Sequence, residues 1–206
     1  ITTANYPMQI ARPFLPGEIP NYPQVRINGV GVLTQADVKQ RYPDGSVKHA
    51  IITFLIPLLN ANSTVTLSFR DQPTGNNTPF LSGADMLQNS FDFEAKMDLT
   101  DTNTAATVSA SARTMIQNNA FTYWMKGSVA TSVIIADHSV ARAYDIGYDS
   151  FKPFRPIFHA TFFPGINKVR VRFIGEISNT EAMEDMAYNL ELRTGNTISV
   201  PVYTKN

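Results

Sequence analysis

The sequence predicts an all-β fold, in which a single barrel or sandwich of antiparallel strands carries one to three short helical turns in a central excursion. Three observations predict it. Apolar and polar residues alternate mostly with a period of two, turn-forming residues are frequent (11 Gly and 13 Pro in 206 residues), and only 17% of the residues are charged. We expect such a composition in an extracellular protein or one exposed on the surface of a cell or virion.

The N-terminal half contains one strongly predicted hairpin. Residues 42–46 (YPDGS) place Pro and Gly where a tight turn requires them, which predicts a hairpin over 38–54. In its second arm two sets of side chains alternate between the faces, Val47, His49, Ile51 and Thr53 on one and Lys48, Ala50, Ile52 and Phe54 on the other. Further strands are expected at 25–32, 36–42 and 64–69.

The second half begins with the most regular alternation in the chain, over residues 91–99. Further strands are expected at 127–136, 154–163, 168–177, 188–192 and 197–203. Short helical turns are expected at 84–89, 111–118 and 181–186. We expect residues 1–206 to form one domain, with a loop at 100–107 between two halves, 1–99 and 108–206.

Composition excludes several classes of function. Lys and Arg (17) balance Asp and Glu (17), so the net charge is zero and no basic surface for nucleic acid is indicated. Cysteine is absent, which excludes disulfides and thiolate zinc ligands. The longest apolar run, 50–59, contains Pro57 and falls far short of the roughly 20 residues that cross a bilayer. We therefore expect no nucleic-acid partner, no membrane insertion, no metal and no cofactor.

The hairpin over 155–177 gives the most geometric prediction of a ligand site. With residues 164–167 (PGIN) as its loop, Thr161 faces Arg170, His159 faces Arg172, and Arg155 faces Glu176, all on one side. The other side collects Phe158, Ala160, Phe162, Val169, Val171 and Phe173. Because Arg presents a planar donor fork that matches carboxylates, this face suits an acidic sugar. The alternative is a solvated sheet face with Glu176 as its counter-ion.

Other candidate residues have two interpretations each. His49 is a general base or a sugar contact, since imidazole titrates near neutral pH, or a histidine at the edge of the core. Lys48 is a ligand contact or, like Arg41, a solvated charge on a strand. Trp124, the only tryptophan, is a stacking platform for sugar rings or a buried anchor of the sheet.

Several segments resemble the N-terminal domain of the exo-rhamnogalacturonan lyase-like family. The segments are 12–19 (RPFLPGEI), 35–38 (QADV), 41–50 (RYPDGSVKHA), 126–131 (KGSVAT) and 162–171 (FFPGINKVRV). The resemblance covers roughly residues 8–193, and it implies a RIFT barrel and a carbohydrate-linked context. Tyr42 and His49 stand where that family often has Trp. Enzymes of the family continue into a helical toroid and a further β-domain, which the 206 residues do not include.

Three functions follow as hypotheses. The first is a non-catalytic, carbohydrate-associated β-domain that contacts acidic polysaccharide or glycan. The second is a structural subunit of an extracellular filament or viral assembly, a homo-oligomer built through sheet edges such as 197–203. The third is a self-contained polysaccharide lyase acting by β-elimination. In that enzyme Arg170 or Arg172 stabilises the enolate, and His159 or His49 removes the proton.

Overall fold

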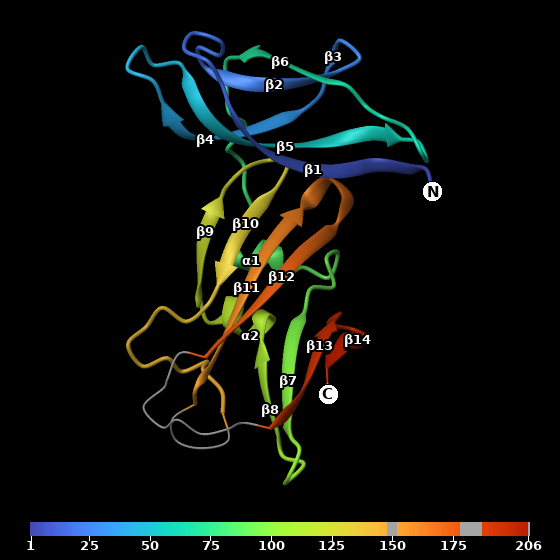
Figure 1. Ribbon diagram of the computed structural model, residues 1–206, viewed down its shortest axis with the longest axis vertical. Helices are drawn as coiled ribbons and strands as arrows, with labels where there is room; N and C mark the ends of the chain where they lie inside the picture. The colour runs from blue at the N-terminus through green and yellow to red at the C-terminus, as the bar shows by residue number, and fades with distance from the viewer. Residues whose placement is uncertain (148–151, 178–186, 206) are drawn as a thin grey trace. The chain divides into compact units, whose positions relative to one another are not determined.

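The computed structural model describes residues 1–147, 152–177 and 187–205, and strands dominate them (Figure 1). The all-β class predicted from the sequence is confirmed, with four antiparallel sheets. The chain divides into two compact units, described separately below. The first unit comprises 1–81, 125–131 and 163–168, and the second comprises 82–124, 132–162 and 169–206.

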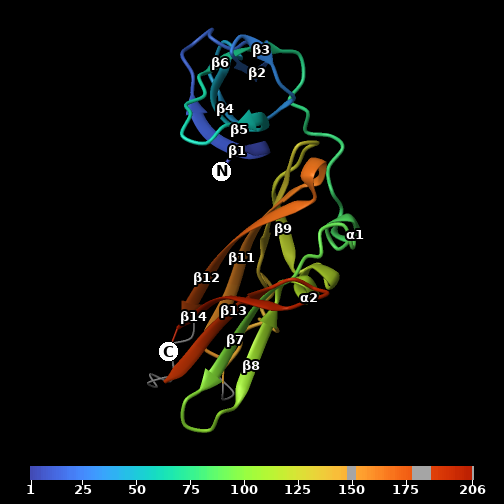
Figure 2. The ribbon, with the colours of Figure 1, turned by 90° about the vertical axis from the view of Figure 1, so that its right-hand side faces the viewer.

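The first unit contains two three-stranded sheets. The strands are β1 (Thr3–Pro13), β2 (Tyr22–Ile27), β3 (Val30–Gly31), β4 (Thr34–Arg41), β5 (Val47–Leu59) and β6 (Leu67–Gln72). One sheet has the order β1-β5-β4 and the other β3-β2-β6, and β5 pairs antiparallel with both of its neighbours. Figure 2 shows the strands curving around a shared interior.

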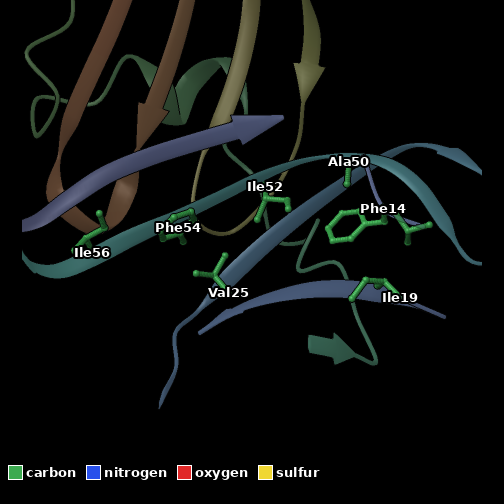
Figure 3. Packing of buried hydrophobic residues seen from close by; sticks show 8 residues of the cluster. Phe14, Ile19, Val25, Ala50, Ile52, Phe54 and Ile56 are labelled. Carbon is green, nitrogen blue, oxygen red and sulfur yellow. The ribbon is translucent and has the colours of Figure 1, made fainter. Parts of the chain in front are cut away.

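The core of the first unit grows from the apolar run in β5. Ala50, Ile52 and Phe54 have no exposed surface, and they share the face of the sheet that points into the interior, as the period of two requires. The other sheet adds Val25, and the loop before it adds Phe14 (Figure 3). Burying a side chain of this kind stabilises the fold by about 1.5–3 kcal/mol, so one shared core holds both sheets together.

The turn between β4 and β5 forms as predicted. The backbone N–H of Tyr42 donates to the carbonyl of Ser46 at 2.8 Å, and Gly45 donates to Tyr42 at 2.9 Å. Gly45 has a φ of 87°, a left-handed conformation that a side chain disfavours. The carboxylate of Asp44 accepts hydrogen bonds from the hydroxyl of Ser46 (2.6 Å) and from its N–H (2.9 Å), and these bonds lower the pKa of Asp44.

The second unit contains two four-stranded sheets, of order β12-β11-β10-β9 and β14-β13-β7-β8. Its strands are β7 (Ala95–Asp101), β8 (Thr107–Ser111), β9 (Phe121–Met125), β10 (Thr131–Ile135), β11 (Phe154–Phe163), β12 (Lys168–Ile177), β13 (Tyr188–Thr194) and β14 (Val200–Lys205). Two helices, α1 (Gly83–Met86) and α2 (Ala112–Gln117), interrupt them. The buried ring of Phe162 contacts Phe91 and Phe93 edge-on, with centroids 5.4 and 4.9 Å apart.

Two predicted segments differ from the structure. The strand expected at 91–99 begins only at Ala95, because Asp92 adopts a φ of 44° and its carboxylate accepts hydrogen bonds from the N–H (2.8 Å) and hydroxyl (2.7 Å) of Thr197. Residues 100–107 do not separate two halves. They form the tip of the β7–β8 hairpin, where Thr100 lies opposite Thr107 and their hydroxyls are 2.9 Å apart.

Other predicted elements are shifted, missed or outside the described residues. The strand expected at 127–136 is confined to β10, and the one expected at 197–203 is β14. β1, β8 and β9 were not predicted, whereas α1 and α2 match two of the expected helical turns. The third turn, at 181–186, lies outside the described residues. The hairpin of β11 and β12 has the predicted bounds.

Candidate functional site

The hairpin of β11 and β12 presents a row of cations on its edge strand. Lys168, Arg170 and Arg172 are exposed, and they alternate with half-buried apolar residues that face the core. We call Arg170 and Arg172, which both belong to the second unit, the cationic row. The hairpin closes through the short 3₁₀ turn η1 (Pro164–Ile166) and then Asn167, which has a left-handed φ of 50°. The four-residue loop predicted from the sequence is therefore confirmed (Figure 1).

An ion pair at the far end of the hairpin fits the predicted register. Nη1 of Arg155 lies 3.7 Å from Oε2 of Glu176. Together with Phe163 and Lys168 flanking the loop, this contact fits a register in which His159 lies opposite Arg172. The solvent-facing side of the hairpin thus combines a half-buried imidazole with exposed guanidinium groups.

The side chains of this hairpin differ in whether they already form hydrogen bonds or ion pairs with other protein groups. Arg155 already has partners, because its Nη2 donates to the carbonyl of Asp137 at 2.9 Å and its Nη1 pairs with Glu176. Within the described residues, the side chains of Arg172 and His159 have no hydrogen-bond or ion-pair partner. Arg172 and His159 are therefore the two predicted residues of this face best placed to contact a ligand.

The carboxylates beside Arg155 serve the local fold. Asp145 is buried, which raises its pKa, while the charges of Arg142 and Arg155 oppose that shift. Nη2 of Arg142 lies 2.6 Å from Oδ2 of Asp145. In Asp137 burial also raises the pKa, but hydrogen bonds from Ser139, Ala143 and Tyr144 together outweigh it and leave the pKa below its ordinary value. These contacts give the carboxylates a structural role beside Arg155.

Trp124 and the candidates of the first unit have contrasting environments. Trp124 is 54% exposed, so the interpretation as a buried anchor is wrong. The hydroxyl of Tyr42 donates to the carbonyl of Phe14 at 3.0 Å, and Nζ of Lys48 lies 5.6 Å from the Tyr42 ring centroid. These contacts favour a structural role for Tyr42 and Lys48. His49 is half-buried in the central strand β5.

Arg41 also has a structural role. Its guanidinium donates to three backbone carbonyls, those of Pro20 (3.3 Å), Asn21 (2.9 Å) and Gly45 (2.8 Å). These bonds tie the segment before β2 to the β4–β5 turn, so the exposed charge of Arg41 also has a structural role.

The residues that carry the resemblance to the lyase-like family interlock in this structure. Glu18 accepts a hydrogen bond from the N–H of Leu15 at 2.9 Å and pairs with Arg12 at 3.1 Å. The hydroxyl of Ser46 accepts from the N–H of Gly17 at 2.9 Å. The PGE and DGS segments thus bind each other, which accounts for them without a ligand.

Gln35 has a structural role of the same kind. It has no exposed surface, and its Oε1 accepts hydrogen bonds from the N–H groups of Val129 (3.2 Å) and Ala130 (2.8 Å). Nε2 of Gln35 is buried without a partner in the described part of the chain. Gln35 therefore fixes the segment 125–131 against β4 within the first unit.

A polar pocket lies along β4, which is an edge strand of its sheet. Its volume is about 320 Å³, and we call it the β4-edge pocket. Its lining residues are Tyr22, Asp37, Val38, Lys39, Gln40, Arg41 and Asn77. We did not predict this pocket, because its walls come from three segments that only the folded chain brings together. The four polar residues among the five of 37–41 are the one signal in the sequence that indicates it.

No group of three or more His, Asp or Glu side chains among the described residues is arranged to hold a metal ion. No helix in the same residues has the length and apolar character needed to span a bilayer.

Comparisons with known proteins give no assignment. No model of a protein family matches the sequence, no curated protein matches it, and no solved structure matches the fold.

Proposed function

We propose that this chain is a carbohydrate-associated β module that binds an acidic glycan along the cationic row, with Arg172 and His159 as principal contacts. The observation that carries the proposal is the exposed pair of cations in this row, in which the Arg172 guanidinium has no partner within the described residues. The RIFT-type architecture and the extracellular setting belong to the same proposal, and the resemblance of 12–50 and the composition support them.

The spacing of the row favours an extended polymer. Alternate residues of a strand lie roughly 6.6 Å apart, so Arg170 and Arg172 are separated by about the same distance. The Arg172 guanidinium can donate two parallel hydrogen bonds to a carboxylate. A row on an open strand has no enclosing wall to select a small free acid, whereas a polyuronate offers carboxylates at regular intervals.

The row also has a purely structural explanation. Charged side chains on an edge strand prevent it from pairing with the edge of another molecule, and β12 is such a strand. The two explanations predict different behaviour when Arg172 is replaced. If Arg172 binds glycan, its replacement weakens glycan affinity. If its charge instead prevents pairing of the strand edge, its replacement increases self-association.

The test is calorimetric titration of the protein with oligogalacturonate and with a neutral oligosaccharide of equal length. We expect binding of the acidic oligomer only, weakening with added salt. Arg172→Gln removes a charge-assisted contact of about 1.5–3 kcal/mol, so affinity falls at least about tenfold. Arg70→Gln, at an exposed arginine of β6, is the matched control and leaves affinity unchanged.

Two results would overturn the proposal: equal affinity for both oligomers, or binding that Arg172→Gln does not weaken. Absorbance of unsaturated uronide in the same samples tests whether the module is itself a lyase.

A second candidate function rests on β14. Every residue of this edge strand is exposed, including Val200, Val202 and Tyr203. Unlike β12, this edge presents mainly apolar side chains, as a strand that pairs with another chain does. We propose a second copy of this chain as its partner.

Light scattering over a concentration series tests the assembly. We expect association that Val202→Lys abolishes and that Leu58→Lys, at another exposed apolar residue, leaves intact. A monomer at every concentration contradicts it.

A further inference from the structure

We infer that the β4-edge pocket is a binding site for a neutral, hydroxyl-rich sugar ring, separate from the cationic row. All seven lining residues belong to the first unit, whereas Arg170 and Arg172 belong to the second. The inference therefore concerns a different site and a ligand of different charge.

One wall of the pocket is a loop fixed by backbone and amide hydrogen bonds. The carbonyl of Gly75 accepts from the N–H of Ala36 at 2.8 Å, and Nδ2 of Asn76 donates to the carbonyl of Thr34 at 2.8 Å. A Cβ at Gly75 would lie 2.8 Å from the Ala36 carbonyl oxygen and 2.9 Å from a ring carbon of Tyr22. Only glycine therefore allows this close approach, which positions Asn77 at the pocket.

A second wall is held by Arg41 and Tyr22. The guanidinium of Arg41 is fixed by its three carbonyl acceptors and lies 5.2 Å from the Tyr22 ring centroid. The backbone N–H of Tyr22 is held by the Asp71 carboxylate at 3.2 Å. Both walls are thus ordered before any ligand arrives, which reduces the entropy lost on binding.

Several polar groups of the pocket remain available. Among the described residues, the Tyr22 hydroxyl, the Gln40 amide and Oδ1 of Asn77 have no hydrogen-bond partner. They include both donors and acceptors, which is what the hydroxyl groups of a sugar require. The Tyr22 side chain adds the apolar surface on which a sugar ring packs.

The charges of the pocket favour a neutral ligand. Nζ of Lys39 lies 3.0 Å from Oδ1 of Asp37, so these two charges compensate each other, and three of the five N–H donors of Arg41 are bonded to backbone carbonyls. A volume of about 320 Å³ is at the small end of the roughly 300–1,000 Å³ range of ligand pockets. Both features fit one or two neutral pyranose residues.

The test is a saturation-transfer NMR titration of the full chain with neutral trisaccharides of glucose, galactose, mannose and xylose. We expect at least one to bind, and Gln40→Ala and Asp37→Asn each to weaken it about two- to tenfold. Gln88→Ala is the control for Gln40, since both side chains are exposed. Asp98→Asn is the control for Asp37, because Lys96 and Asp98 form the same kind of i, i+2 ion pair at 2.9 Å.

The outcomes separate this inference from the proposed function. Absence of binding by all four trisaccharides, or binding that neither Gln40→Ala nor Asp37→Asn weakens, overturns the inference. If only Arg172→Gln weakens neutral-sugar binding, the sugar occupies the other site, and the inference is again wrong. Oligogalacturonate binding is unaffected by Gln40→Ala if both sites exist as described.

Discussion

Gln35 provides the sharpest test of how the first unit is held together. In Gln35→Met a side chain of similar length replaces the amide, and the N–H groups of Val129 and Ala130 lose their acceptor. Each buried donor left without a partner costs about 1–3 kcal/mol. The substitution also removes the buried, unpartnered Nε2 donor of Gln35. Its removal stabilises the folded state by about the cost of one such group. We therefore expect a net loss of about 2 kcal/mol in the free energy of unfolding.

Two assays measure this effect. Urea unfolding followed by circular dichroism gives the change in free energy, at an unchanged slope if the denatured state is unaffected. Hydrogen exchange resolved by NMR then localises the change, because the amides of Val129 and Ala130 exchange faster by about 30-fold at 2 kcal/mol. The amide of Ile52, in the centre of β5, serves as the reference.

A double-mutant cycle with Gly127 tests the same contact from its other side. A Cβ at Gly127 would overlap the side-chain amide of Gln35, so Gly127→Ala costs about 1–3 kcal/mol in the wild type. In the Gln35→Ala background the overlap is gone, and we expect little or no further cost. A neutral Gln35→Met, or additive effects in the cycle, refutes the structural role assigned to Gln35.

Three further substitutions have defined outcomes. Phe54→Ala removes a fully buried ring and should cost about 3–5 kcal/mol in urea unfolding, whereas a cost below about 1 kcal/mol contradicts the packing described. Thr161→Val leaves the buried hydroxyl of Ser132 without its 2.8 Å partner and should cost about 1–3 kcal/mol, measured in the same way; a neutral result means that the bond adds nothing. Because the folded pKa of Asp44 is lowered, its contribution is present above its ordinary value of 3.8 and is lost as the pH falls through the folded pKa. Asp44→Asn should therefore be less stable than the wild type at pH 7 and equally stable in strong acid. A difference in stability that persists in strong acid argues against this link between the pKa of Asp44 and stability.

Local pattern and turn chemistry were sufficient to predict the hairpin of β11 and β12. Residues 154–159 and 168–173 alternate, and Pro164-Gly165 starts a loop whose length sets which residues flank it. The same reasoning placed the turn at Gly45. Elements that combine a period of two with a turn of defined type can therefore be read from the sequence.

The missed strand β1 shows where such reasoning fails. β1 contains Pro7 and Pro13, residues that disfavour a central strand. Both prolines are tolerated because β1 lies at the edge of its sheet. Only the pairing with β5 reveals this position, and the sequence does not contain that pairing in any local pattern.

The two candidate sites also differ in whether the sequence alone predicts them. The cationic row lies within one hairpin, so alternation placed Arg170 and Arg172 on one face. The β4-edge pocket depends on Gly75 docking against β4 and on Arg41 reaching carbonyls on another segment. Contacts of that kind join residues far apart in the chain, and spacing alone does not predict them.

The most direct test of the glycan-binding account is an NMR titration of ¹⁵N-labelled protein with oligogalacturonate at low ionic strength. We expect saturable chemical-shift changes of the backbone amides in 168–173 and around His159. These changes should disappear in the Arg172→Gln variant. Shifts confined to other strands, or unchanged spectra at millimolar oligosaccharide, would show that this face does not bind acidic glycans.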